Sequence, residues 1–313
     1  MDKNITVADL EALPPSHGSF VGIDSDGCVF DTMEVKQKRH FHPLIIQWWE
    51  LEKLEPELRA SAEFVNLYSK WRGQNRFTAL LQVFELLHEW PACVAKAAAC
   101  HVELPKLDAL RAYCNSGLAL SNPVLKQEAE RTGDPELKRL LGWSLAVNAD
   151  IDQHMAPVPP FPWALKALEL MRGKSDCIVV SQTPEAALVK EWQHHKIEHF
   201  VRAIAGQELG TKAEHITLVS AGKYPPGRVL MVGDALGDLK AAEKAGALFF
   251  PVMPREEDAA WQRFCEEGYP RFLDGAFAGA YADGLKTTFL AALPEKAPWQ
   301  KVAGASSPLA ENG

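Results

Sequence analysis

Carboxylate and hydroxyl side chains follow three short apolar runs that lie far apart in the chain. These segments are Asp24-Ser25-Asp26-Gly27 after Phe20–Ile23, Ser181-Gln182-Thr183 after Cys177–Val180, and Gly233-Asp234 with Asp238 after Val229–Val232. If the runs are parallel strands, their carboxyl ends meet at one sheet edge, which is where ligands bind in open α/β sheets. Clustered carboxylates repel one another unless a hard cation lies among them, and magnesium prefers a few carboxylates plus water and substrate oxygens. The sequence therefore predicts a Mg²⁺ site at this edge.

The same groups suit transfer of a phosphoryl group. Once a metal has neutralised the local charge, Asp24 can attack phosphorus and form an aspartyl-phosphate. Asp26, two residues on, has its side chain on the same side and can protonate the leaving oxygen and later activate water. The dispersed negative charge of a phosphoryl group also needs fixed donors and a cation. Ser181, the backbone N–H groups after Asp24 and a lysine are the candidates.

The elements that must position these residues alternate between strand and helix in the second half of the chain. Apolar runs and helical spacing predict the following order: helix 163–172, strand 177–180, helix 184–195, strand 200–204, helix 212–221, strand 229–232, helix 236–245 and a strand near 248–252, with helical patterns again over 255–292. Together with a first strand at 20–23, this alternation predicts a Rossmann-like parallel sheet with helices on both faces. Residues 1–18, which contain prolines and glycine, are expected to form a loop.

A long helical block interrupts this α/β pattern. Apolar residues recur at helical spacing around 77–87 and 137–145, and no segment between 33 and 155 alternates like a strand. Prolines at 157, 159, 160 and 162 then indicate a stiff junction. We therefore expect a discontinuous α/β core over 1–32 and 158–295, an inserted all-helical domain over 33–157, and a disordered tail over 296–313.

In order and spacing, these motifs resemble the haloacid dehalogenase (HAD) superfamily, in its magnesium-dependent phosphatase branch. The resemblance covers roughly residues 19–32 and 158–252 and implies a HAD-like fold in which the helical block is the cap domain. It implies that Asp24 is the nucleophile and a metal ligand, and that Asp26 is the acid/base and coordinates metal through its carbonyl. It further implies that Asp234 and Asp238 hold the metal or its waters. Ser181, Gln182 and a lysine would bind the phosphoryl oxygens.

Two lysines compete for that cationic role. Lys212 opens a predicted helix 22 residues before Asp234, whereas Lys223 lies at the far end of the same helix, where lysines commonly cap the dipole. Family spacing favours Lys212. Three positions depart from the family pattern, namely Cys28, Gln182 and Ala235, and none of them removes a catalytic group. The acid at Asp26 argues against the dehalogenase and phosphonate-cleaving branches, which lack it.

Each motif also has a plain structural interpretation. An Asp-x-Asp-Gly segment occurs in surface turns and calcium loops, although here Val29 and Val35 occupy the positions where a calcium loop needs Gly and Glu. Asp234 and Asp238 can cap a helix, and Ser181 can be a turn residue. In the helical block, the loop Trp71–Phe77 offers Arg72 and Arg76 for contact with an anionic or hydroxyl-rich substrate. Its alternative is a solvated turn with ordinary arginines.

Composition limits the partners. The net charge of −8 and pI near 5.7 argue against a nucleic-acid or anionic-membrane binder. The six cysteines are scattered without zinc spacing, and no apolar stretch has the length of a signal peptide or membrane span, so a reduced, cytoplasmic protein is expected. The leading hypothesis is hydrolysis of a small phosphorylated metabolite. A phosphomutase that uses the same core residues, and a non-catalytic binding protein on this fold, are the alternatives.

Overall fold

The computed structural model describes residues 5–303 and divides the chain into two compact units. The α/β unit comprises Met1–Lys36 and Met155–Ala292, and the helical unit comprises Gln37–His154 and Leu293–Gly313. The chain therefore changes unit within about four residues of the boundaries expected at 32/33 and 157/158. Residues 293–295 belong to the helical unit, not to the α/β core as expected.

The α/β unit contains one five-stranded parallel sheet in the order β3-β2-β1-β4-β5. Its strands are β1 (Phe20–Ile23), β2 (Asp176–Val180), β3 (Ala203–Ala205), β4 (Val229–Gly233) and β5 (Leu248–Pro251). The strand order runs outward from β1 to β3 and then reverses to β4 and β5, so the topological switch point lies between β1 and β4. The predicted Rossmann-like α/β fold is confirmed.

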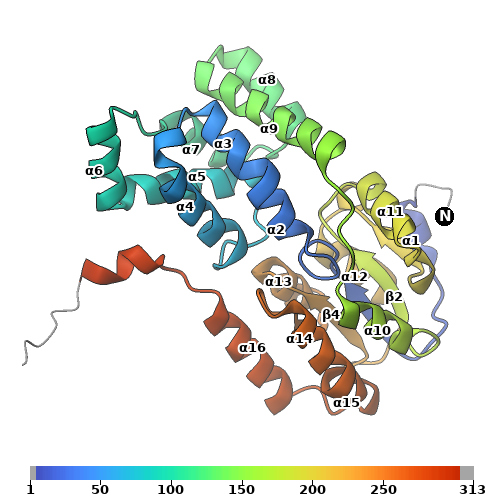
Figure 1. The fold of residues 1–313 in the computed structure, drawn as a ribbon. Coiled ribbons are helices and arrows are strands. Elements are labelled where there is room, and N and C mark those ends of the chain that lie inside the picture. The colour runs from blue at the N-terminus through green and yellow to red at the C-terminus, as the bar shows by residue number, and fades with distance from the viewer. Residues whose placement is uncertain (1–4, 304–313) are drawn as a thin grey trace, which may run out of the picture. The chain divides into compact units, whose positions relative to one another are not determined.

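Helices cover both faces of this sheet (Figure 1). The helices of the α/β unit are α1 (Val7–Ala12), α2 (Thr32–Lys36), α10 (Pro162–Met171), α11 (Glu185–His194), α12 (Lys212–Ser220), α13 (Leu236–Lys244), α14 (Glu257–Arg263), α15 (Tyr269–Asp274) and α16 (Ala280–Ala292), with short helical turns η3 (Glu198–Phe200), η4 (Gln207–Leu209) and η5 (Phe264–Gly268). Val21 and Ile23 pack in one buried cluster with Leu168 of α10. A Cβ on Gly22, between them, would meet Ile216 of α12 at 3.6 Å. Successive β1 residues therefore face opposite helical layers, as a buried parallel strand requires.

The N-terminal segment corrects one expectation. Residues 1–18 were expected to form a loop, but α1 occupies Val7–Ala12. The Thr6 side chain accepts a hydrogen bond from the Asp9 N–H, and the Asp9 carboxylate accepts one from the Thr6 N–H. This reciprocal capping box satisfies two backbone donors that a short helix otherwise leaves open.

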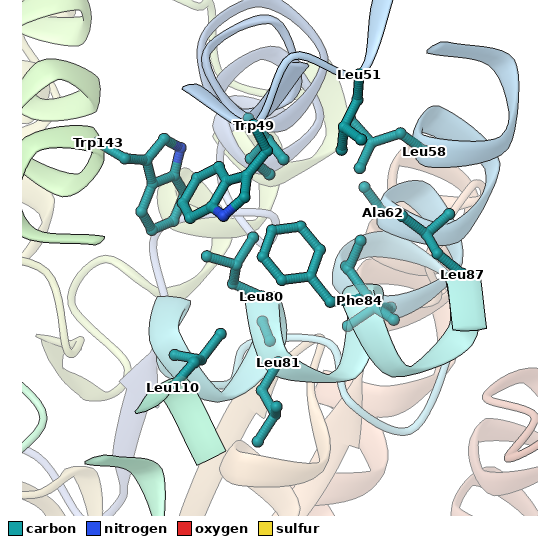
Figure 2. Close-up of a cluster of buried hydrophobic side chains, with 14 of the residues drawn as sticks. Trp49, Leu51, Leu58, Ala62, Leu80, Leu81, Phe84, Leu87, Leu110 and Trp143 are labelled. Carbon is teal, nitrogen blue, oxygen red and sulfur yellow. The ribbon is translucent and has the colours of Figure 1, made fainter. Parts of the chain in front are cut away.

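The helical unit is built from helices alone between residues 37 and 154, all of which the structure describes. Its elements are the π-helical turn η1 (Gln37–Phe41), α3 (His42–Trp48), η2 (Glu52–Leu54), α4 (Glu55–Leu67), α5 (Arg76–Glu89), α6 (Pro91–Cys100), α7 (Asp108–Cys114), α8 (Asn122–Thr132), α9 (Pro135–His154) and η6 (Pro298–Ala303). Figure 2 shows part of the apolar core, in which the Trp49 ring lies edge-on to Phe84 and Trp143, with ring centroids 5.0 and 5.9 Å away.

The C-terminal segment corrects a second expectation. The tail over 296–313 was expected to be disordered, but η6 begins at Pro298, and the Trp299 ring stacks on Trp90 with centroids 4.2 Å apart. Burial of these two aromatic faces stabilises the segment against the helical unit. Residues 304–313 lie outside the described residues. Within residues 5–303, no helix has the length and apolar character needed to cross a membrane.

Candidate active site

The candidate site lies at the carboxyl ends of β1 and β4, on either side of the switch point. Ile23 pairs with Val232, and the Asp24 N–H donates to the Val232 carbonyl at 3.0 Å. Asp24 thus directly follows β1, and Asp234 directly follows β4. Sheet register alone brings together two acids that are 210 residues apart in the chain.

Three carboxylates gather at this edge. Asp24, Asp234 and Asp238 each offer an oxygen that lies within 4.8 Å of the other two, and all three residues are at most 5% exposed. The Lys212 ammonium group lies among them. It is 2.7 Å from Asp24 Oδ2 and 2.6 Å from Asp238 Oδ1. The predicted acids and the favoured lysine therefore occupy one buried cluster.

The competing lysine lies elsewhere. The Lys223 ammonium donates to the backbone carbonyls of Glu11, Leu13 and Leu218, at 2.6, 3.1 and 3.3 Å. It ties the end of α12 to the N-terminal segment, which is the structural role expected for a lysine at a helix end. Of the two candidates, the structure places only Lys212 beside Asp24.

The two carboxylate oxygens of Asp238 have different partners. Its Oδ2 accepts hydrogen bonds from the backbone N–H groups of Asp234 and Ala235, at 3.1 and 3.0 Å, while Oδ1 pairs with Lys212. The helix-capping interpretation of Asp238 is confirmed, and the same side chain also belongs to the acidic cluster through its pair with Lys212. The preceding glycine is required for close approach, because a Cβ on Gly233 would lie 2.5 Å from Asp238 Cγ.

The electrostatic balance of the cluster fits a divalent cation. Burial raises the pKa of Asp24, Lys212 opposes this effect, and the charges of Asp238 and Asp234 raise the pKa further. A single lysine cannot neutralise three buried carboxylates, so Asp24 needs additional positive charge to be fully ionised. An all-oxygen set of this kind is what Mg²⁺ prefers. The residues present therefore fit a magnesium ion.

Asp26 lies two residues beyond Asp24 and is held by three donors. Its Oδ1 accepts hydrogen bonds from Thr32 Oγ1 and from Lys36 Nζ, the latter at 2.6 Å, and its Oδ2 accepts one from Thr183 Oγ1 at 2.6 Å. Burial by itself would raise the pKa of Asp26, but the Lys36 charge and these hydrogen bonds outweigh it and lower the pKa to about 2.

Sequence reasoning missed these three partners. Thr32 and Lys36 are four residues apart on α2 and so share one helix face, which was a readable signal. Thr183 lies in a segment that was already noted as polar. A fourth missed residue is Glu191 on α11, whose pKa burial and the nearby Asp26 charge raise to about 7, against the opposing charge of Lys36.

The segment after β2 supplies the predicted hydroxyl. Ser181 is 2% exposed, and its Oγ accepts a hydrogen bond from the Thr183 N–H at 3.1 Å. β2 pairs with β1 in parallel, with Val179 opposite Ile23, so Ser181 lies one strand away from the acids. The Gln182 amide donates to the Gly210 carbonyl at 2.9 Å and so connects this segment to the loop before Lys212.

The two arginines singled out in the helical unit have partners within that unit. Arg72 is 4% exposed and donates to the Leu67 carbonyl at 2.9 Å. Arg76 is the first residue of α5. Its guanidinium donates to Ser144 and Asn148 of α9, and burial lowers its pKa to about 10. Two alternatives were left open for these arginines, a substrate-contacting loop and a solvated turn. Arg72 is buried rather than solvated, and both guanidinium groups donate to partners within the helical unit.

All six cysteines are free. Cys28, one of the departures from the family pattern, is fully buried in the core, where a free cysteine packs as a small apolar side chain.

Comparison with known proteins gives structural likenesses only. No protein-family model and no curated protein matches the chain. A HAD-superfamily hydrolase of Geobacter sulfurreducens is 14% identical, with 75% of this chain and 89% of that chain covered and a TM-score of 0.34. A haloacid dehalogenase-like hydrolase of Streptococcus pneumoniae is 14% identical, with 78% and 90% covered and a TM-score of 0.38. A HAD hydrolase of Bacillus subtilis, solved with bound magnesium, is 12% identical, with 75% and 86% covered and a TM-score of 0.41. These values are too low to transfer a function.

Proposed function

We propose that this chain is a magnesium-dependent phosphatase of the HAD superfamily that hydrolyses a small phosphate monoester through an aspartyl-phosphate. The observation that carries the proposal is the placement of Lys212 between Asp24 and Asp238 within a buried cluster of three carboxylates. Such a cluster is costly to bury and has no evident packing benefit, so a function that uses its charge is the natural explanation.

In this proposal Asp24 is the nucleophile. One of its carboxylate oxygens forms a bond to phosphorus while the bond from phosphorus to the ester oxygen breaks. For this step Asp26 must first take up a proton, which the negative charge of a phosphate bound beside it would favour by raising its pKa. Asp26 then gives this proton to the departing oxygen, so the alcohol leaves neutral. A water molecule then attacks phosphorus, Asp26 takes its proton, and the bond to Asp24 breaks to release inorganic phosphate.

The remaining residues hold charge in place during these steps. Asp24, Asp234, Asp238 and the Asp26 carbonyl would hold magnesium, which neutralises the carboxylates and the phosphoryl oxygens when bound. Lys212 and the Ser181 hydroxyl would bind the phosphoryl oxygens. Gln182 supports this site through the Gly210 carbonyl. Residues 37–154 would correspond to the inserted cap of the family, and the substrate would be a small phosphorylated metabolite.

The test is turnover of a panel of phosphorylated metabolites with Mg²⁺ by wild type and Asp24→Asn. We expect the variant to lose about 10³-fold or more of kcat, because its amide cannot attack phosphorus. Chelation of magnesium should abolish wild-type turnover. Asp283→Asn is the matched control, because Asp283 is an exposed acid of α16 in the same unit.

Three outcomes would count against the proposal. Retained activity in Asp24→Asn would show that Asp24 is not the nucleophile. Conversion of one phosphorylated isomer into another without release of inorganic phosphate would favour the phosphomutase. Failure of the wild type to turn over any monoester would shift weight to the binding protein.

A further inference from the structure

The carboxyl group of Asp26 is fixed by donors that come from two separate segments. Thr32 and Lys36, the first and last residues of α2, both donate to Oδ1. Thr183, which follows β2, donates to Oδ2. A carboxylate with a free side chain samples several rotamers, whereas one held at both oxygens by charged and neutral donors has a single orientation.

The Lys36 contact is short but not deeply buried. The ammonium lies 2.6 Å from Oδ1, and the two side chains are 22% and 17% exposed. Ion pairs of this accessibility contribute modestly to folding. Its geometry therefore suggests a role in orientation. Lys36 is also the last residue of the α/β unit, and the π-helical turn η1 begins at the next residue. π-turns inside helices occur frequently at functional sites.

We propose that Lys36 is a positioning residue which, with Thr32, holds the Asp26 carboxyl in one orientation, with Oδ2 toward the segment that follows β2. This inference rests on the proposed phosphatase function. The two oxygens have different partners. Oδ1 is anchored by a lysine, which can only donate, whereas Oδ2 meets the Thr183 hydroxyl, which can rotate and become an acceptor. Oδ2 is the oxygen on the side of the Ser181 segment, and it is the one that is not paired with a charged donor.

The experiment compares two esters that differ in their need for an acid. Ethyl phosphate has a poor leaving group that requires protonation, whereas p-nitrophenyl phosphate releases a stable anion. In Lys36→Met we expect kcat for ethyl phosphate to fall about tenfold or more, a part of the whole contribution of general acid catalysis. For p-nitrophenyl phosphate we expect a fall of less than about threefold, with KM little changed for both esters. Lys36→Arg should recover most of the loss, because its guanidinium restores a cationic donor.

The matched control is Lys38→Met. Lys38 lies two residues further along the chain and pairs with Glu63 Oε2 at 3.5 Å. It should leave both esters unaffected. An equal loss on both esters in Lys36→Met, or no loss on either, would overturn the inference.

A second measurement separates this inference from the phosphatase proposal. In crystal structures of the wild type and Lys36→Met, we expect the Asp26 carboxyl to rotate or lose defined density in the variant. An unchanged Asp26 would overturn the positioning role whatever the kinetics show. Wild-type protein that hydrolyses neither these esters nor any member of the metabolite panel would contradict the phosphatase proposal itself, and the crystal comparison would still decide whether Lys36 positions Asp26.

Discussion

The two units differ in what they bury. Among the described residues, every fully buried carboxylate belongs to the α/β unit: Asp24, Asp176, Asp234 and Asp238. The helical unit instead buries a continuous apolar core, whose buried polar residues are serines, histidines and Arg72. The difference arises at the strand ends. There the parallel sheet offers unpaired backbone N–H groups, and the strand register fixes where charged side chains lie. In packed helices, the backbone N–H groups are hydrogen-bonded within the helix. The α/β unit therefore buries carboxylates at its strand ends, whereas the helical unit buries mainly apolar side chains.

The largest expected loss of stability tests whether the apolar core holds the helical unit together. Trp143 of α9 is 1% exposed and contacts Phe41 and Trp49, with ring centroids 6.0 and 5.9 Å away. We expect Trp143→Ala to lower the free energy of unfolding by about 3–5 kcal/mol, because it removes buried area and leaves a cavity. Urea unfolding followed by circular dichroism measures the change.

The control for Trp143→Ala comes from the same helix. Leu145 is 51% exposed, so Leu145→Ala should cost less than about 0.5 kcal/mol. If the two variants were equally destabilised, the apolar core would not be what holds the helical unit together. At temperatures where Trp143→Ala remains folded, the kcat of the proposed phosphatase reaction should be close to that of the wild type.

Acid should weaken the helical unit through a buried base. His42 is fully buried, and neither ring nitrogen has a hydrogen-bond partner. Burial, aided by the charges of Arg59 and Lys38, lowers its pKa from 6.5 to about 3. Between these values the unfolded chain binds a proton that the folded chain does not, so stability is lost as pH falls below about 6.5. At 1.36 kcal/mol per pH unit, the loss attributable to His42 is about 2 kcal/mol between pH 6.5 and pH 5.

The measurement is the difference between wild type and His42→Leu across that pH range. Other groups, including His215 of the α/β unit with its pKa lowered to about 4 by burial, are present in both proteins and cancel. The variant should be as stable as the wild type at pH 7, because the replaced ring makes no hydrogen bond. Parallel stability curves for the two proteins would show that His42 is not the group that senses acid.

How far the sequence predicts the structure also differs between the units. β1 was predicted at its observed bounds, because an apolar run stops abruptly where Asp24 begins. The acids were predicted to meet because parallel register fixes strand ends, whereas Lys212 was chosen over Lys223 from the spacing of the family that the motifs resemble. Partners that depend on side-chain reach were missed, such as Lys36 on Asp26. In the helical unit, the polar Trp71–Phe77 segment left a substrate-contacting loop and a solvated turn as alternatives. Neither predicted that Arg72 is buried, because burial is decided by the packing of helices distant in sequence. The stacking of Trp299 on Trp90 was unpredictable for the same reason.

The smallest expected change in stability comes from removing one helix-capping side chain in each unit, which compares the two units by the same kind of substitution. Thr211 caps α12 directly before Lys212. Its Oγ1 accepts from the Glu214 N–H at 3.3 Å, and the Glu214 carboxylate accepts from the Thr211 N–H at 2.7 Å. Asn75 caps α5 in the helical unit by accepting from the Phe77 N–H at 3.0 Å. Thr211→Ala and Asn75→Ala should each lower the free energy of unfolding by about 1 kcal/mol.

Turnover should distinguish these two caps, although stability does not. Fraying of the first turn of α12 moves the backbone that carries Lys212, and small misplacement of a charged group at a reacting centre lowers rate. We therefore expect Thr211→Ala to reduce kcat about three- to tenfold, and Asn75→Ala to leave it within about twofold. A changed KM in Asn75→Ala would show instead that the loop beside Arg76 senses substrate, in which case the helical unit contributes chemistry as well as packing. Equal kcat values in both variants would mean that Lys212 is held by its two carboxylate partners alone, independently of the helix that bears it.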